Sequence, residues 1–419
     1  MKKLFLIPLC LIFIVACNNE GPEGPDNLQE PNIGAYDNYS YSSLTPEQQK
    51  DKLAEESDAI LSNLNDLPNA DGIKVLKSFF ELLDISAPEL EDVLNYDSNA
   101  GIIAIEVKDM NGEFTWNTAT ESWTKKVLSN KIVFNFPVEK STSNNGKVEI
   151  TGTGSGAWVD DDDDEKFELP KNAKFVAFLS NREVANVEIK ATDPNTDNIA
   201  KDASVKVLLG NYVISADAKK GADSKVGSTF SFKAGNNVIL DAVLSSTIDW
   251  EYIYEYERYV GYDNEKWESI YETAMDTTIM LDYQSAEVNI GTNLAIVGYA
   301  NVKAINNRLD EIYEKYEKTY GYDSWNWTDA VKEAKVKEEA AAYNANMKMS
   351  LVSKKDEYKI AAVKFGYTYE IDNYDGRKNY YEEPIFVFND ETEASVETFF
   401  GSGFNRVIEA WEDFFMGFE

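Results

Sequence analysis

Residues 228–244, STFSFKAGNNVILDAVL, contain the pattern that decides the fold. Two runs, 228–232 and 237–244, are rich in β-branched and aromatic residues, and the turn residues 234–237 separate them. Two such runs joined by a short turn predict a β-hairpin with antiparallel strands. The stretch therefore indicates a meander of hairpins and not a sheet of βαβ units.

The same alternation with short turns extends in both directions from this hairpin. Strands are expected at residues 102–107, 112–116, 132–136, 148–151, 174–179, 184–191, 205–209 and 212–216, and later at 347–353, 358–370 and 384–388. In residues 250–260 aromatic and acidic residues alternate, so this stretch is expected to be a further strand. Residues 99–300 are therefore predicted to form an antiparallel β region.

Helical spacing occurs on both sides of this β region. Thr45, Pro46 and Gln48 are typical of a helix start with a capping box, and residues 45–98 are expected to be a helical region that ends in a short element at 88–94. Residues 301–346 form a second helical segment, and residues 347–419 add hairpin strands and an amphipathic helix at 396–415. The predicted fold class is α+β: an extended antiparallel β-sheet or meander with an N-terminal helical region and C-terminal helices packed on the sheet.

The first 16 residues have the composition of a signal peptide. Two lysines precede the apolar run 4–14, which is shorter than the ~20 apolar residues that span a bilayer. A small residue, Ala16, precedes Cys17 as in a lipobox, so Cys17 is expected to carry a lipid that anchors the protein to a membrane. Residues 17–44 are then a flexible tether, because their Pro, Gly and polar residues bury too little apolar surface to order the chain.

The composition excludes several kinds of active site. Histidine is absent, and the two cysteines are Cys10, which leaves with the signal peptide, and Cys17, so a Ser-His-Asp triad, a histidine zinc site and a disulfide in the mature chain are excluded. The formal net charge of −34 repels polyanions, so nucleic acid is not an expected partner. The 74 acidic residues could include the carboxylate pair of a glycoside hydrolase, but no motif selects one, and a non-enzymatic role is expected.

Aromatic residues gather in two related phrases, at 256–267 and 316–327. Sugar rings stack on the faces of Trp and Tyr, and neighbouring carboxylates can fix the sugar hydroxyls. The candidate glycan-binding residues are Tyr262, Trp267, Tyr322, Trp325 and Trp327. The alternative is that these side chains pack between the sheet and its helices.

Acidic residues are most concentrated at 160–165. Asp160, Asp162 and Asp164 are a candidate metal site, because carboxylate oxygens are the ligands that Ca²⁺ prefers. The stretch lacks the spacing of an EF-hand loop, and a solvated hairpin tip is the alternative. No other cofactor is expected.

The phrases FTWN (114–117), KIVFNFP (131–137) and FFGSGF (399–404) accompany the lipobox at Cys17. Together they resemble the large uncharacterised lipoproteins of Bacteroidetes. The resemblance implies a lipid-anchored protein of the cell envelope, and Asn18 after Cys17 implies sorting to the outer membrane, with the protein facing the periplasm or the cell surface. It carries over no functional residue.

Several roles stay open for a non-enzymatic binding or scaffold lipoprotein. The first is glycan binding through the aromatic phrases. The second is a lipid carrier, in which a curved sheet with an apolar concave face holds a lipid. A purely structural partner of other envelope proteins is a third role, and a carboxylate-based glycoside hydrolase is the lower alternative.

Overall fold

A computed structural model describes residues 28–86, 111–128, 130–160, 166–192, 202–221, 225–248, 281–321, 326–372 and 376–401. These residues form one large sheet and a few helices, so the predicted α+β class is confirmed. The helices are η1 (Ile33–Tyr36), α2 (Pro46–Leu64), η2 (Leu67–Asn69), α3 (Asp71–Ser86), α6 (Val302–Tyr320) and α7 (Asp329–Asn346). Within the described residues, no helix is long and apolar enough to cross a membrane.

The sheet contains 17 strands among the described residues. They are β1 (Ser40–Tyr41), β2 (Gly112–Asn117), β3 (Ser122–Val127), β4 (Ile132–Phe136), β5 (Gly146–Asp160), β6 (Lys166–Leu179), β7 (Arg182–Thr192), β8 (Asp202–Leu209), β9 (Tyr212–Lys220), β10 (Lys225–Ala234), β11 (Asn237–Ile248), β12 (Leu281–Ile290), β13 (Leu294–Ala300), β14 (Met347–Ser353), β15 (Tyr358–Ile371), β16 (Lys378–Val387) and β17 (Glu393–Ser395).

The strands pair in the order β3, β2, β4, β5 and then consecutively to β17. The sheet is mixed, because β2 pairs with β4 and β1 pairs with β15 in parallel, while the other pairs are antiparallel. β13 pairs directly with β14, although α6 and α7 lie between them in the chain. The predicted helical segment 301–346 is therefore an insertion within one continuous sheet.

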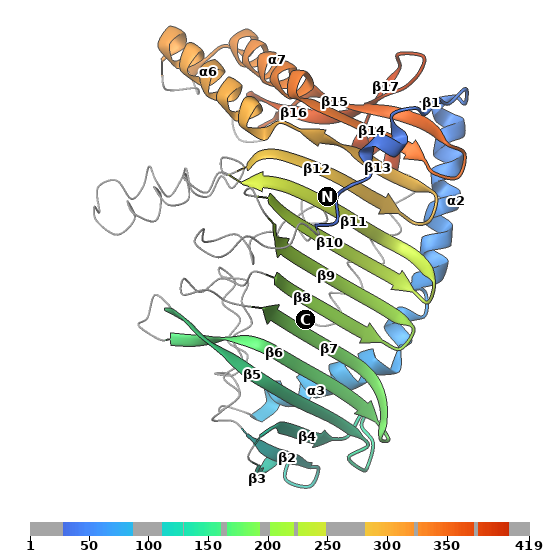
Figure 1. The fold of residues 1–419 in the computed structure, drawn as a ribbon, viewed down its shortest axis with the longest axis vertical. Helices are drawn as coiled ribbons and strands as arrows, with labels where there is room; N and C mark the ends of the chain where they lie inside the picture. Colours follow the sequence, from blue (N-terminus) through green and yellow to red (C-terminus); the bar gives the residue numbers. More distant parts are fainter. Residues whose placement is uncertain are drawn as a thin grey trace.

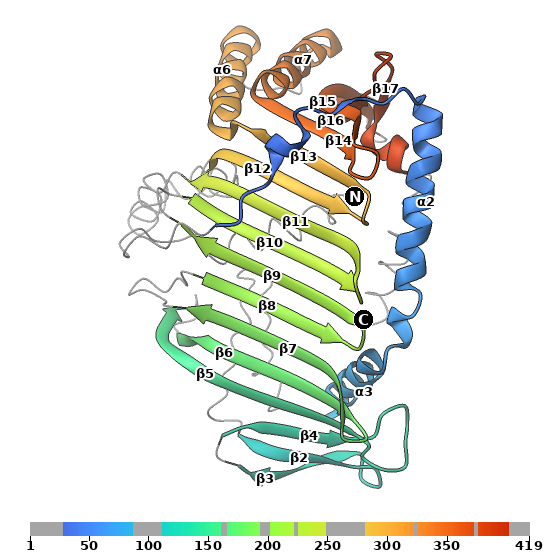
Figure 2. The same ribbon diagram turned by 45° about the vertical axis from the view of Figure 1, so that its right-hand side comes forward.

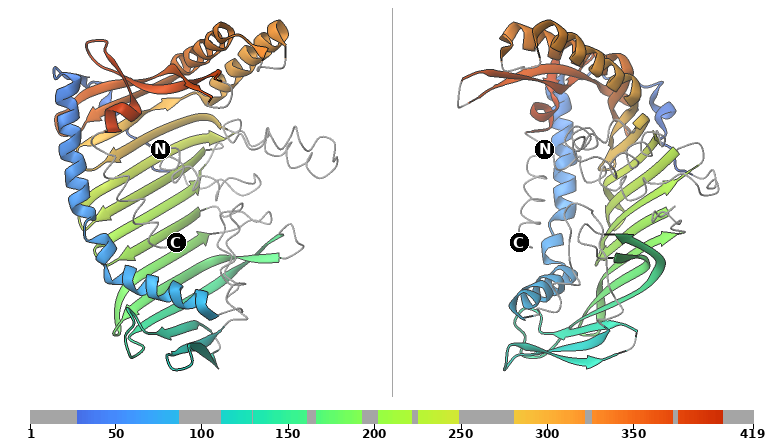
Figure 3. Two further views of the ribbon diagram at one scale, coloured as in Figure 1. Left: turned by 180° about the vertical axis from the view of Figure 1, so that it is seen from behind. Right: turned by 90° about the vertical axis from the view of Figure 1, so that its left-hand side faces the viewer.

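The sheet is strongly curved. Figure 1 shows the strands stacked along the long axis of the molecule, and in Figure 3 (right) both ends of the sheet bend toward the side on which α2 and α3 lie. α2 and α3 run across the strands at one edge of the sheet, as Figure 2 shows. We call this edge, where β6–β7, β8–β9, β10–β11, β12–β13 and β14–β15 are joined by short turns, the turn rim.

A core of apolar side chains joins α3 to the end of the sheet that contains β4. Phe79 of α3 is buried, and its ring centroid lies 5.0 Å from that of Phe134 and 5.4 Å from that of Phe136. Phe134 also stacks on Phe114 at 4.9 Å. Burial of such aromatic side chains is the main apolar contribution that holds the helix on the sheet.

Residues 28–41 cross the convex side of the sheet, opposite α2 and α3. A Cβ at Gly227 of β10 would lie 3.2 Å from the side chain of Leu28, so the glycine leaves room for this leucine. The Tyr36 hydroxyl donates a hydrogen bond of 2.7 Å to Glu287 of β12, and burial and this carboxylate raise the pKa of Tyr36. The chain then pairs through β1 with β15 before α2 begins, so the predicted flexible tether of residues 17–44 was wrong for residues 28–44, which lie on the sheet.

Several local predictions are confirmed. The Thr45 side chain accepts from the backbone N–H of Gln48 at 3.3 Å, and the Gln48 side chain accepts from the N–H of Thr45 at 3.0 Å, which completes the capping box. β4 and β14 have the predicted bounds, whereas β3, β12 and β13 were not predicted and β16 begins six residues before the predicted 384 (384 − 378 = 6). The elements predicted at 88–94, 102–107 and 250–260, and the part of the C-terminal helix beyond 401, lie outside the described residues.

Candidate functional site

The concave face of the sheet is apolar across nine adjacent strands. Because the strands are in register, side chains from β5 to β13 form continuous rows. The first row, nearer the turn rim, consists of Ile150, Phe175, Val187, Val207, Ile214, Phe232, Leu240, Ile290 and Leu294. The second row, from β6 to β14, consists of Ala173, Ile189, Val205, Ala216, Phe230, Ala242, Val288, Ile296 and Leu351.

From β7 to β12 a polar row lies on the convex face, whereas in β13 and β14 this face carries Ala295, Val297 and Val352, which pack with Tyr36. The row that lies between the two apolar rows, but on the opposite side of the sheet, consists of Glu188, Lys206, Ser215, Ser231, Asp241 and Asn289. A sheet with one solvated face needs polar residues only on that face, so apolar rows on the other face must be covered by something. From β7 to β12 the concave face is therefore the apolar side of the sheet.

α2 and α3 cover only part of the concave face. Their buried side chains Ile60, Ile73 and Phe79 belong to a cluster that includes Phe232 and is bordered by Phe175, Val207 and Ile214 of the first row. Several side chains remain half-buried: Val187, Ile189, Val205, Phe230, Leu240 and Val288. Apolar side chains of this size in two adjacent rows form a contiguous surface, which is characteristic of a binding site.

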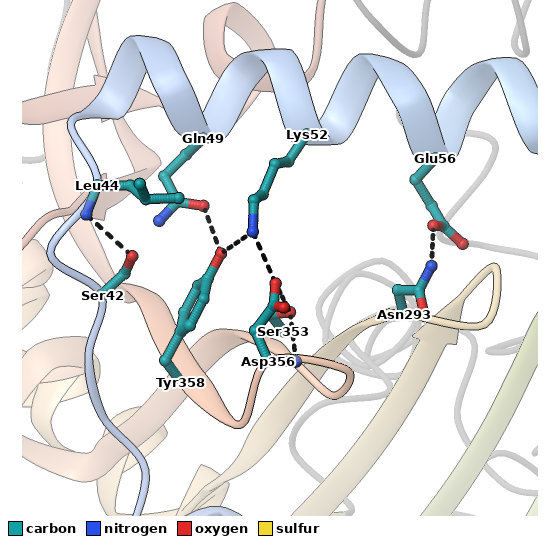
Figure 4. A network of polar contacts seen from close by, with 9 residues as sticks. All are labelled: Ser42, Leu44, Gln49, Lys52, Glu56, Asn293, Ser353, Asp356 and Tyr358. Carbon is teal, nitrogen blue, oxygen red and sulfur yellow. Dashed lines mark hydrogen bonds and ion pairs between the residues drawn. The ribbon is translucent and has the colours of Figure 1, made fainter.

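α2 is attached to the turn rim by polar contacts, as Figure 4 shows. The Lys52 ammonium donates to Asp356 at 2.7 Å and to the Tyr358 hydroxyl at 3.1 Å, and the Tyr358 hydroxyl donates to Gln49 Oε1 at 3.3 Å. The Lys52–Asp356 pair raises the pKa of Lys52 and lowers the pKa of Asp356. The side chains of Lys52 and Asp356 are 43% and 35% exposed, so solvent screens their attraction. The pair therefore contributes mainly to the position of α2.

Further contacts continue along the rim. The Asn63 carbonyl accepts from the Tyr212 hydroxyl at 2.9 Å, and its side-chain oxygen accepts from Asn237 at 3.0 Å. Asp71 of α3 pairs with Arg182, the first residue of β7, at 2.5 Å. These contacts connect α2 and α3 to the turn rim at the β6–β7, β8–β9, β10–β11 and β14–β15 hairpins.

Trp327 corrects one expectation from the sequence. It is 8% exposed and packs between α6 and α7 with Ile312, Tyr316 and Ala342, and its indole N–H donates to the Gly321 carbonyl at 3.0 Å. The ring therefore offers no free face to a sugar. Burial and the neighbouring Glu338 carboxylate raise the pKa of Tyr316 to about 12.

The other predicted site residues are not brought together by the described part of the chain. Tyr262, Trp267, Tyr322 and Trp325, the lipidation residue Cys17, and Asp162 and Asp164 lie outside the described residues. Asp160 is the last residue of β5 and pairs with Lys166 of β6. Within the described ranges, no group of three His, Cys, Asp or Glu residues is arranged to hold a metal ion, and the Ca²⁺ site stays a prediction.

The sequence predicted most of the strands and offered an apolar concave face as one alternative, but it did not identify the residues that form this face. The apolar residues at alternate positions of 184–191, 205–209, 212–216 and 228–232 already indicate one apolar face. The pairing registers that align these positions into rows come only from the structure.

Comparisons of the chain with protein-family models, with curated proteins and with solved structures found no match.

Proposed function

We propose that this protein is a non-enzymatic lipoprotein of the cell envelope that holds an amphipathic molecule with a long hydrocarbon chain on its concave face. The observation that carries the proposal is the pair of apolar rows that runs from β5 to β14. The lipid on Cys17 would anchor the protein to the outer membrane, with residues 18–27 between the anchor and the first described residue.

The energetics favour a hydrocarbon chain over a sugar. Burial of a methylene group contributes ~0.8 kcal/mol, and each carbon that contacts the apolar rows adds to binding without a specific polar partner. A sugar on the same rows would bury hydroxyl groups, each of which costs ~1–3 kcal/mol when it lacks a hydrogen-bond partner. Since the half-buried side chains in the centre of these rows are Val, Ile, Leu and Phe, an acyl chain fits this surface best.

The polar end of the molecule would lie away from the turn rim. Beyond the second row, on the same face, the positions include Ser228, Ser246 and Gln284. These polar positions lie among apolar ones, since Ser228 pairs with Leu244 and Ser246 pairs with Val226. A head group near these three residues could bond to their side chains, while its hydrocarbon chain lies along the apolar rows.

The test is equilibrium binding of a fluorescent long-chain fatty acid to residues 18–419. Val205→Asp places a carboxylate in the second apolar row, and Lys206→Asp places the same group on the next residue of β8, which faces the convex side. We expect Val205→Asp to weaken binding at least tenfold, or about 1.4 kcal/mol, and Lys206→Asp to leave it unchanged. No binding by the unaltered protein, or equal loss in both folded variants, would overturn the proposal.

A further inference from the structure

Packed cores close both ends of the apolar rows. At the β5 end, Ile150 is 8% exposed and belongs to the same cluster as Phe79 of α3. At the other end, Leu294 of β13 and Leu351 of β14 are 4% and 0% exposed, and both pack in a cluster with Leu53 of α2. Because such cores are close-packed, a hydrocarbon chain that lies along the rows cannot extend past either end.

The side chains between these two ends are half-buried. In the first row this holds from Phe175 on β6 to Ile290 on β12, except for Phe232, which belongs to the cluster under α2 and α3. In the second row it holds from Ile189 on β7 to Ile296 on β13, except for the two alanines on β9 and β11. From β7 to β12, both rows therefore keep part of their apolar surface uncovered.

The partly covered stretch has a defined length. Five intervals separate β7 from β12, and at ~4.8 Å per interval the stretch measures ~24 Å. A straight hydrocarbon chain with C–C bonds of ~1.5 Å advances ~1.25 Å per carbon, so about 19 carbons fill this stretch. Side chains two residues apart on one strand are ~6.8 Å apart, so a chain that lies between the two rows contacts both of them.

We infer that the concave face selects a straight hydrocarbon chain of about 18 to 20 carbons, which the cores at Ile150 and Leu351 limit at its two ends. A shorter chain leaves half-buried side chains of the rows without a contact, so it binds more weakly. Carbons beyond this length meet a closed core and remain in water. The inference rests on the proposed function and adds the length and the direction of the bound chain.

A series of straight-chain fatty acids measures the length limit on residues 18–419. The acids range from about 10 to about 24 carbons and displace the fluorescent fatty acid at concentrations below those at which they form micelles. Each pair of added methylene groups should tighten binding about tenfold up to about 18 carbons, and the gain should cease by about 22 carbons. An affinity that levels off at about 12 carbons, or that still rises tenfold between about 20 and 24, would overturn the inference. No displacement by any acid would instead overturn the proposed function.

Variants at the β7 end test whether the chain lies along the rows. The polar residues Ser246 and Gln284 that could hold the head group lie on β11 and β12, so only a long chain reaches Ile189 on β7. Ile189→Asp places a carboxylate there, and Lys190→Asp places it at the next residue, which faces the convex side. We expect Ile189→Asp to weaken binding of an acid of about 18 carbons at least tenfold, and to leave an acid of about 12 carbons, which spans ~15 Å, unchanged. Lys190→Asp should change neither.

The result for Ile189→Asp bears only on the length and direction of the bound chain. Equal weakening of both acids, or weakening of neither, would overturn the inference and leave the proposed function intact, because the unaltered chain would still bind fatty acids. If Ile189→Asp does not fold, as judged by circular dichroism, the length series on the unaltered chain is decisive, since it needs no substitution.

Discussion

The Glu56 carboxylate of α2 accepts a hydrogen bond of 2.8 Å from the backbone N–H of Thr292, although the two residues are 236 positions apart in the chain. The same carboxylate accepts a second bond of 2.6 Å from the Asn293 side chain. Glu56 is only 8% exposed and lies over the β12–β13 turn, where Gly291 has a φ of 62° and leaves room for it. This contact joins the helix to the middle of the turn rim.

Removal of the Glu56 carboxylate should therefore destabilise the protein. Glu56→Ala leaves two donors without their acceptor, and such a loss costs ~1–3 kcal/mol for a buried group. We expect the free energy of unfolding to fall by about that amount in urea denaturation. Glu55→Ala, at an exposed position one residue earlier, is the matched control and should change it by less than about 0.5 kcal/mol. Equal effects of the two variants would contradict the role given to Glu56.

Gly298 lies on the concave side of β13 and allows β14 to approach closely. A Cβ there would overlap the Lys348 backbone carbonyl and lie 2.6 Å from Met349 Cα, and neither atom can move without disturbing the strand pair. Gly298→Ala should destabilise the protein by ~1–3 kcal/mol, as overpacking does. At Gly366 the nearest atom to a Cβ is the Ile385 Cδ1 at 3.2 Å, which can rotate away, so thermal unfolding of Gly366→Ala should resemble that of the unaltered chain.

Trp327→Ala tests whether this residue serves packing or ligand binding. The side chain is enclosed by Ile312, Tyr316 and Ala342, and truncation of a buried Trp typically costs ~3–5 kcal/mol. We expect a large loss of stability in denaturant titrations and unchanged affinity for the fluorescent fatty acid at temperatures where the variant is folded. Full stability together with loss of binding to a polysaccharide in affinity gels would instead restore the glycan hypothesis.

Glu382 gives a prediction about pH. Burial under α7, followed by the nearby Glu339 carboxyl, raises the pKa of Glu382 above its ordinary value of 4.5. The folded state therefore holds this proton more tightly than the unfolded state does. The protonated carboxyl contributes its full stabilisation below about pH 4.5, and this stabilisation is lost as the pH rises through the raised pKa.

Glu382→Gln should remove the loss of stability that accompanies deprotonation of Glu382. The variant should be more stable than the unaltered chain at about pH 7 and no more stable at about pH 4, as judged by denaturation midpoints at each pH. Glu383→Gln, on the neighbouring residue of β16, is the control and should not show the pH-dependent gain. A gain of equal size at both pH values would contradict a role for the Glu382 proton.

The sequence was sufficient for much of the secondary structure. The local alternation of residues predicts both ends of β4 and of β14, and the Thr45–Gln48 capping box predicts the start of α2. These signals depend only on residues that are neighbours in the chain. β12 was missed because its concave side carries Gln284 and Ala286, which weaken the alternation. Its pairing with β11 and β13 compensates for a weak local preference.

The candidate site depends on relationships that local sequence does not contain. The apolar rows need the register of nine strand pairs, and the curvature needs α2 to contact turns more than 200 residues away, as Glu56 does. The burial of Trp327 depends on α6 and α7 lying side by side, and an aromatic residue between acidic neighbours fits an exposed turn equally well from sequence alone. Long-range packing therefore decided which residues form the apolar rows and which of the two readings holds for Trp327.

Native mass spectrometry of the mature chain, with Cys17→Ser and purified from a bacterial envelope under gentle conditions, tests the central claim most directly. We predict a population with an added mass that matches a lipid or fatty acid, which is lost in Val205→Asp and retained in Lys206→Asp. A single species with the mass of the bare polypeptide, which also takes up no fatty acid when it is supplied, would contradict the account of the concave face as a binding surface.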